Sequence, residues 1–138
     1  MSTQKRYAPI IDKLRNAGLR PTRQRIALGE LMFRGDDRHV SAEMLHNEAL
    51  KARVSVSLAT VYNTLHQFTQ AGLLREIAVE AGRSYFDTNT SDHHHFYFES
   101  DGHLEDVKSD DVVVSSLPTP PRGAKISRVD VVIRVSED

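Results

Sequence analysis

The stretch from Ser57 to Phe68 reads SLATVYNTLHQF and predicts the helix on which the fold depends. Ser57 is a favoured residue at a helix N-terminus. Apolar residues then recur at helical spacing and form one stripe, namely Leu58, Val61, Leu65 and Phe68. The opposite face carries groups that hydrogen-bond phosphates or base edges, namely Ser57, Thr60, Tyr62, Asn63 and His66. This pattern predicts a recognition helix with one buried and one polar face.

Helical patterns precede this stretch and a hairpin pattern follows it. Helices are predicted from Tyr7 to Ala17, from Pro21-Thr22 onward and from Ser41 onward. Two strand-like runs, residues 73–79 and 83–88, flank the turn Glu80-Ala81-Gly82. Helices followed by such a hairpin are typical of a winged helix-turn-helix, and a small helical domain with an ordinary solvated face is the alternative.

Arginines surround the predicted recognition helix. Three of them cluster at the start of the second helix and one lies in the hairpin, namely Arg20, Arg23, Arg25 and Arg83. Such side chains suit phosphates or a narrow minor groove. The sequence therefore predicts double-stranded DNA as a partner.

The charge of the 138-residue chain is divided between its two parts. Residues 1–86 carry 13 Lys/Arg and 8 Asp/Glu, whereas residues 87–138 carry 5 and 11. A basic part suits a polyanion and an acidic, histidine-rich part suits cations. We therefore expect a domain boundary near residues 86–92. No long apolar run or leader segment is found, so a cytoplasmic protein is expected.

The run from Ser91 to Phe98 reads SDHHHFYF and predicts a metal-binding strand. Alternation along a strand places His93 and His95 on one face and His94 on the other. Two such imidazoles form half of a transition-metal site. The chain has no cysteine, which excludes disulfides and thiolate zinc sites.

The remaining residues predict a small sheet. A partner strand for the histidine strand is expected at residues 103–107. Prolines at positions 118, 120 and 121 prevent a long helix there. A last strand is expected at residues 126–135. A sheet of this size is marginal alone, so pairing with a second copy is expected.

At these residues the chain resembles the ferric uptake regulator family. The motifs that carry the resemblance are LRPTRQR at residues 19–25, HVSAE at 39–43, LATVYNTL at 58–65 and AGL at 71–73. The resemblance implies an α+β protein that is not an enzyme: a homodimeric, metal-responsive transcriptional regulator. It implies a winged-helix domain at residues 1–88 with a hinge at 86–92, followed by a small α/β dimerisation and sensing domain at 93–138.

The resemblance also implies a regulatory metal site. Five residues of this chain match the family's ligands. They are a histidine before the third helix (His39), an acid after the wing (Asp87), the two alternate histidines of the run (His93 and His95) and a further acid (Asp106). These N/O ligands accept Fe²⁺, Mn²⁺ or Zn²⁺ without strong preference.

The chain departs from the family in ways that indicate one branch. Phe98 and Asp101 stand where relatives usually have the first cysteine pair of a structural zinc site. The histidine run, the missing cysteines and the proline-rich segment resemble the iron response regulator branch. That branch implies haem bound by His93, His94 and His95, with His46 and His66 as possible further ligands; imidazole is an ordinary haem ligand. For these last two, ordinary surface and groove-facing roles are the favoured reading.

Two alternatives stay open. The ligand set also resembles ferrous-iron peroxide sensors of the same family, although these normally keep the cysteine zinc site. From another class, the cluster fits a metal-dependent hydrolase, but no HExxH or comparable motif is present.

Overall fold

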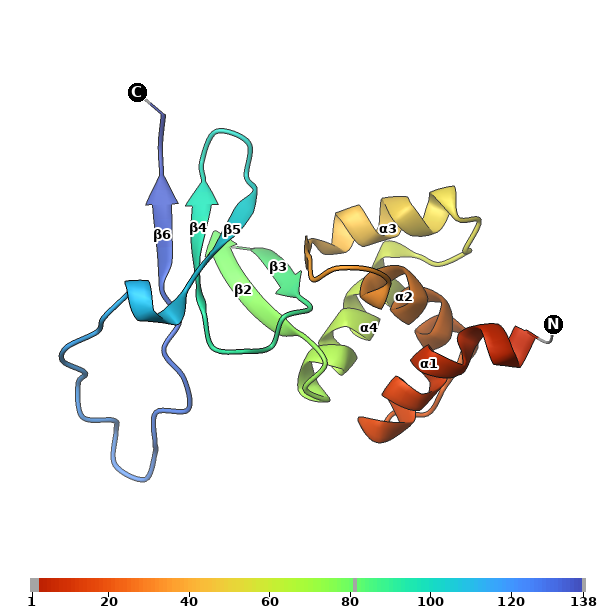
Figure 1. Cartoon of the computed structure of the whole chain (residues 1–138), viewed down its shortest axis with the longest axis horizontal. Helices are drawn as coiled ribbons and strands as arrows, with labels where there is room; N and C mark the ends of the chain where they lie inside the picture. Colours follow the sequence, from red (N-terminus) through yellow and green to blue (C-terminus); the bar gives the residue numbers. More distant parts are fainter. Residues whose placement is uncertain (1–2, 81, 138) are drawn as a thin grey trace. The chain divides into compact units, whose positions relative to one another are not determined.

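The computed structural model describes residues 3–80 and 82–137, with side chains from residue 7 onward. The chain divides into two compact units, which we call unit 1 (Met1–Thr90) and unit 2 (Ser91–Asp138). Figure 1 shows helices and a small sheet in unit 1 and a second small sheet in unit 2. Ala81, in the predicted hairpin turn, lies outside the described residues.

The described residues of unit 1 form four α-helices, whose bounds are α1 Thr3–Asn16, α2 Arg23–Phe33, α3 Ala42–Lys51 and α4 Leu58–Gln70. The last three begin with side-chain caps, in which Thr22, Ser41 and Ser57 accept a hydrogen bond from a backbone N–H three residues ahead. Each cap satisfies a donor that the first helical turn leaves open. The helices predicted from these capping residues are confirmed.

The core of unit 1 lies between the helices and the inner side of the sheet. It consists of fully or nearly fully buried apolar side chains, chiefly Ile10, Leu14, Leu28, Met32, Leu45, Val61, Leu65, Phe68 and Phe86. Three members of the stripe predicted on α4 belong to it, and Leu58 packs against its edge. The apolar face of α4 is therefore buried, which leaves its polar face at the surface.

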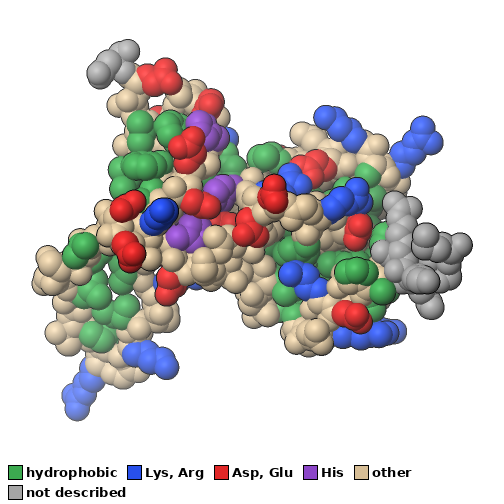
Figure 2. Space-filling model, viewed as in Figure 1, with side chains coloured by type: hydrophobic (Ala, Val, Ile, Leu, Met, Phe, Trp, Pro, Cys, Tyr) green, Lys and Arg blue, Asp and Glu red, His purple; other side chains and the backbone are tan. Residues whose placement is uncertain are grey.

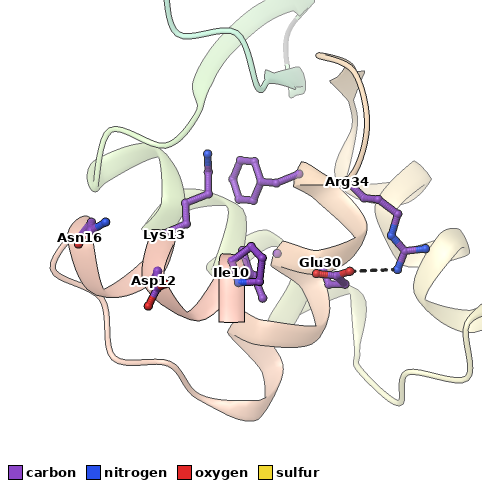
Figure 3. A pocket seen from close by; sticks show the side chains of 9 residues that line it. Ile10, Asp12, Lys13, Asn16, Glu30 and Arg34 are labelled. Carbon is purple, nitrogen blue, oxygen red and sulfur yellow. Dashed lines mark hydrogen bonds and ion pairs between the residues drawn. The ribbon is translucent and has the colours of Figure 1, made fainter. Parts of the chain in front are cut away.

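Helices α1 and α2 cross closely because α2 has a glycine at the crossing. A Cβ atom added at Gly29 would lie 2.6 Å from Cδ1 of Ile10. A surface hollow of about 610 Å³ opens beside this crossing, with Asp12, Lys13, Glu30 and Arg34 at its rim. Figure 3 shows these charged side chains around Ile10. Both charge signs are present, so the hollow has no single electrostatic preference.

The sheet of unit 1 has the strand order β1-β3-β2, all antiparallel. The bounds are β1 His39–Val40, β2 Arg75–Glu80 and β3 Arg83–Asp87. Strands β2 and β3 form the predicted hairpin. The two-residue strand β1 was not predicted, and it pairs His39 with Asp87 and Val40 with Phe86.

The sheet of unit 2 has the order β5-β4-β6, with β4 His94–Phe98, β5 Leu104–Val107 and β6 Val132–Val135. Strand β5 runs antiparallel to β4 and β6 runs parallel to it. One 3₁₀ turn, Ser109–Asp111, follows β5. Among residues 91–137 no α-helix is present, although a small α/β domain was expected; the prolines had excluded only a long helix around residues 117–122.

The expectation of a strand from residue 126 is wrong for its first half. Residues 126–131 are irregular, because β6 pairs with β4 only from His95↔Val132 to Phe98↔Val135. Before His95, strand β4 provides only one further residue, so a longer β6 would have no ladder to join.

Unit 2 leaves apolar side chains at its surface. Exposed fractions reach 83% for Val113, 49% for Leu117 and 43% for Ile126. Figure 2 shows hydrophobic side chains on the surface of this part of the chain, together with a few Lys and Arg side chains. No helix in the described parts of the chain is both long and apolar enough to cross a membrane.

Candidate functional site

The first candidate ligand set is a histidine–aspartate pair in unit 1. His39 and Asp87 face each other across β1 and β3, and Nε2 of His39 lies 3.2 Å from Oδ2 of Asp87. The Asp87 side chain is 1% exposed, and its Oδ1 accepts a hydrogen bond from the backbone N–H of Asn89 at 2.8 Å. A buried carboxylate needs such partners, because burial removes its hydration.

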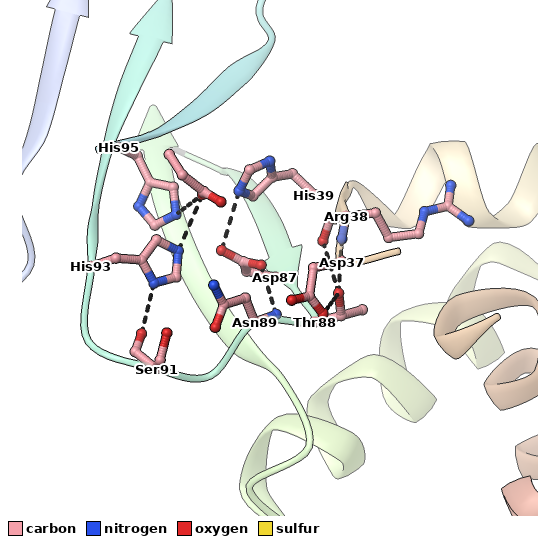
Figure 4. Close-up of polar contacts among 10 residues, drawn as sticks. Asp37, Arg38, His39, Asp87, Thr88, Asn89, Ser91, His93 and His95 are labelled. Atoms are coloured by element: carbon pink, nitrogen blue, oxygen red, sulfur yellow. Dashed lines mark hydrogen bonds and ion pairs between the residues drawn. The ribbon is translucent and has the colours of Figure 1, made fainter. Parts of the chain in front are cut away.

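The residues around this pair fix the position of β1. The backbone N–H of Arg38 donates to Oγ1 of Thr88 at 2.8 Å. The Arg38 guanidinium donates to both carboxylate oxygens of Glu48 and to the carbonyl of Leu31. Figure 4 shows Asp37 and Arg38 beside Thr88, next to the His39–Asp87 pair. Arg38 therefore joins the start of β1 to α2 and α3, which places His39 opposite Asp87.

The second candidate ligand set lies in unit 2 and consists of His93, His95 and Asp106. Nε2 of His93 lies 3.2 Å and Nε2 of His95 lies 3.5 Å from the same oxygen, Oδ1 of Asp106. The cause is the strand register, which pairs His95 with Asp106 across β4 and β5. Both histidines are buried, whereas the Asp106 side chain is 47% exposed. The predicted sharing of one face by His93 and His95 agrees with their ring centroids, 4.5 Å apart.

A hydrogen bond sets the tautomer of His93. Its Nδ1 lies 2.7 Å from the carbonyl oxygen of Ser91. A carbonyl oxygen only accepts, so Nδ1 carries the proton, and Nε2 of the neutral ring keeps its lone pair. Figure 4 shows His93 between Ser91 on one side and His95 on the other. This arrangement, with one ring nitrogen donating to a carbonyl and the other aimed at a ligand position, is the usual environment of metal-binding histidines.

The third candidate site is the nucleic-acid face of unit 1, which consists of the polar side of α4 and the arginines around it. Of the predicted residues, Arg20, Arg23, Ser57, Asn63 and Arg83 are exposed, and Arg25, Thr60 and Tyr62 are half-buried. The side chains of the exposed members are open to solvent. The half-buried members have partners within the protein.

Arg25 joins α2 to the recognition helix. Its Nε donates to Oε1 of Gln67 at 3.1 Å and its Nη1 donates to the carbonyl of Arg20 at 3.0 Å. It lines a hollow of about 340 Å³, together with Thr22, Gln24, Thr60, Asn63, Thr64 and Gln67. Gln67, which the sequence did not single out, thus holds Arg25 at this face.

Tyr62 also has a partner that the sequence did not indicate. Its hydroxyl donates to Oε1 of Glu43 on α3 at 2.8 Å. This hydrogen bond raises the pKa of the Tyr62 hydroxyl above its ordinary value, and the burial and negative charge nearby act in the same direction. Ser57 and Thr60 are bonded to each other as part of the α4 cap.

His46, His66 and His94 each contact residues of their own unit. Nε2 of His46 lies 3.1 Å from the carbonyl of Val56, so this ring nitrogen donates. His66 stacks beside Tyr62 and meets the edge of Phe86. The backbone N–H of Val131 donates to Nδ1 of His94 at 3.2 Å.

Comparisons with known proteins bear on the whole chain. A sequence model of the "Ferric uptake regulator family" matches residues 16–134. The ferric uptake regulation protein of Bordetella parapertussis is 38% identical over 82 residues, 59% of each chain. That of Cupriavidus metallidurans is 40% identical over 81 residues, 59% of this chain and 57% of the relative. These matches thus span less than two thirds of the length of either curated relative.

Solved structures are similar over more of the chain. The ferric uptake regulator from Pseudomonas aeruginosa, solved with manganese, has a TM-score of 0.71 at 26% identity and covers 93% of this chain and 97% of its own. The regulator from Francisella tularensis, solved with iron, has a TM-score of 0.69 at 20% identity and covers 86% and 92%. At that lower identity the likeness shows the fold alone.

The fold and the candidate ligands define a winged-helix α+β protein with a histidine-bearing second sheet. The chain belongs to the ferric uptake regulator family. Members of that family are transcription regulators rather than enzymes, in agreement with the expectation that this chain is not an enzyme. The expected α+β fold is confirmed.

Proposed function

We propose that this protein is a metal-responsive, DNA-binding transcriptional regulator that acts as a homodimer. The observation that carries the proposal is the convergence of two imidazole nitrogens, from His93 and His95, on one oxygen of Asp106. The tautomer of His93 supports it, because Nδ1 donates to the carbonyl of Ser91 and the lone pair of the neutral ring is then on Nε2, the nitrogen facing Asp106. A regulator of genomic DNA also implies a cytoplasmic location.

The proposed regulatory site takes one divalent cation, and its proposed ligands are His39, Asp87, His93, His95 and Asp106. Nitrogen and oxygen donors of this kind suit Fe²⁺ or Mn²⁺, and Zn²⁺ binds them in vitro. The similar protein from Pseudomonas aeruginosa was solved with manganese and that from Francisella tularensis with iron. When bound, the cation would supply a common centre for these five donors.

The proposed DNA contact places the polar face of α4 in the major groove. Arg20 and Arg23 would bind phosphates beside α4, and Arg83 of the β2–β3 wing would reach the backbone or the minor groove. Arg25, which is hydrogen-bonded to Gln67, would be a further arginine of this DNA contact. Exposure of Asn63 at the middle of α4 supports direct contact with base edges.

The proposed dimer forms through unit 2. One face of its sheet carries half-buried apolar side chains, namely Phe96, Phe98, Ile133 and Val135. Such a three-stranded sheet is marginal alone and gains stability when a second copy covers its apolar face. A dimer would also present two α4 helices to a palindromic operator.

Metal-dependent DNA binding tests the proposal. The full chain is titrated with an operator selected from random DNA, at fixed salt, with and without Mn²⁺. We expect Mn²⁺ to strengthen binding at least tenfold, and His93→Ala or Asp106→Asn to abolish that gain. His103→Ala is the matched control, because His103 is an exposed histidine of the same unit outside the proposed ligand set. Equal Mn²⁺ dependence in His93→Ala and the unsubstituted protein would contradict the proposal.

We further propose that the chain belongs to the iron response regulator branch and responds to haem through His93, His94 and His95. The histidine run and the absence of cysteine support this assignment. In the neutral ring of His94 the proton is on Nε2, because Nδ1 accepts the hydrogen bond of Val131. Haem binding through Nε2 of this residue would therefore require a change of tautomer and release of Val131, which immediately precedes β6.

Haem titration followed by absorbance tests this second proposal. We expect weaker haem binding in His94→Ala than in His103→Ala, and weaker binding to the Mn²⁺-loaded protein than to the metal-free protein. Identical haem affinity with and without Mn²⁺ would show that the two ligands do not compete for His93 and His95.

A further inference from the structure

Glu43 and Tyr62 form a pair on the nucleic-acid face of unit 1. Tyr62 lies on the exposed side of α4 between Thr60 and Asn63, and Glu43 lies in the first turn of α3. The hydroxyl of Tyr62 donates its hydrogen to Oε1 of Glu43 at 2.8 Å. The Tyr62 ring is held from the other side by His66, with ring centroids 6.4 Å apart and planes inclined by 19°.

The direction of this hydrogen bond decides what Tyr62 can offer to DNA. A phenol has one hydrogen to donate, and here a carboxylate, a strong charge-assisted acceptor, takes it. The Tyr62 oxygen then has only lone pairs left. The raised pKa of the hydroxyl keeps it protonated near neutral pH, so the pair persists under ordinary conditions.

We propose that the Glu43–Tyr62 pair is a specificity-determining acceptor that reads an exocyclic amino group, on adenine or cytosine, in the major groove. Only these two bases present a hydrogen-bond donor there, whereas guanine O6 and N7 and thymine O4 are acceptors. Phosphate oxygens are acceptors as well, and the Glu43 charge repels them. The pair would thus contribute to base preference and oppose non-specific binding. This inference rests on the proposed function, in which α4 lies in the major groove.

Glu43 acts through Tyr62 and is a positioning residue in this proposal. Without its carboxylate, the Tyr62 hydroxyl would be free to donate, and its preference would turn toward guanine or thymine. Glutamine at position 43 would keep an acceptor for the Tyr62 hydrogen and remove the charge. The two substitutions therefore separate the direction of the hydrogen bond from the electrostatic effect.

Selection of DNA from a random pool, with the full chain and Mn²⁺ present, tests the inference. We expect the unsubstituted protein to prefer adenine or cytosine at one position of each half-site, by roughly five- to tenfold for one hydrogen bond. Tyr62→Phe should lose the preference at that position alone, and Glu43→Ala should change it to guanine or thymine. Glu43→Gln should keep it and bind non-specific DNA more tightly. Asn47→Ala, an exposed change on the same helix, is the control and should match the unsubstituted protein.

The outcomes separate this inference from the proposed function. If Tyr62→Phe and Glu43→Ala select the same bases as the unsubstituted protein at every position, the pair does not read a base, although DNA binding stands. If the unsubstituted protein enriches no sequence at any Mn²⁺ concentration, the proposed function fails and the inference fails with it.

Discussion

Arg38 and Glu48 join the start of β1 to the end of α3 through two hydrogen bonds between guanidinium and carboxylate. Both side chains are about two-thirds buried, and Arg38 also donates to the carbonyl of Leu31. Paired bonds of this geometry are stronger and more directional than single ones. The pair therefore supports the two-residue strand that places His39 opposite Asp87.

Arg38→Ala should lower the free energy of unfolding by about 1–3 kcal/mol, because it leaves the half-buried Glu48 carboxylate without its partner. Urea unfolding followed by circular dichroism measures this change. Arg34→Ala is the matched control: the Arg34 side chain is 62% exposed and makes one contact with Glu30, at 3.4 Å, so the loss should stay below about 0.5 kcal/mol. Equal losses in the two variants would mean that Arg38 has no special structural role.

Gly29→Ala should destabilise unit 1 because the new Cβ would lie 2.6 Å from Cδ1 of Ile10. Overpacking of this kind costs about 1–3 kcal/mol, against about 1 kcal/mol gained from helix propensity. In an Ile10→Val background the clashing Cδ1 is absent and only a γ carbon, 2.9 Å from the new Cβ in the case of Ile10, stays close, so Gly29→Ala should cost less there. Thermal unfolding of the four proteins of this double-mutant cycle measures the coupling. An equal cost in both backgrounds would contradict the close crossing of α1 and α2.

The turn between β4 and β5 should be strengthened by protonation of His103. Asp101 and, less strongly, Glu105 raise the pKa of His103 above its ordinary value of 6.5, and His103 lowers the pKa of Asp101 below 3.8. The His103 contribution is thus present below pH 6.5 and is lost as the pH rises through its folded-state pKa. The Asp101 contribution is present above pH 3.8 and is lost as the pH falls through its folded-state pKa. The turn should therefore be best protected between about pH 4 and 6.5.

NMR titration of the His103 ring measures this effect. Its midpoint should lie above 6.5 in the unsubstituted protein and fall in Asp101→Asn. The ring also stacks on Phe98, with centroids 4.2 Å apart, and this contact should remain in the variant. An unchanged midpoint would show that Asp101 does not hold the imidazolium.

Local sequence patterns predicted the elements whose stabilising residues are close together in the chain. The α4 helix is set by its Ser57 cap and its apolar stripe, and the β2–β3 hairpin joins adjacent strands. The alternation of His93 and His95 likewise follows from strand geometry alone. These features need no knowledge of distant residues.

The features that the sequence did not reveal depend on partners far along the chain. Strand β1 exists because Val40 and its neighbour pair with β3, more than forty residues later. The Arg25–Gln67 bond joins residues 42 positions apart, and the Tyr62–Glu43 bond joins residues 19 apart. The length of β6 is limited by the residues of β4 with which it pairs. The strand predicted from the apolar run therefore began too early, at residue 126 instead of Val132.

The number of Mn²⁺ ions bound per chain tests the central claim most directly, namely that one cation binds all five proposed ligands. Isothermal titration of the full chain should give one binding event, and both Asp87→Asn and Asp106→Asn should weaken that same event by tenfold or more. Asp101→Asn, an exposed acid outside the ligand set, should leave it unchanged. Two independent events, one lost only in Asp87→Asn and the other only in Asp106→Asn, would show that the two ligand sets do not share an ion.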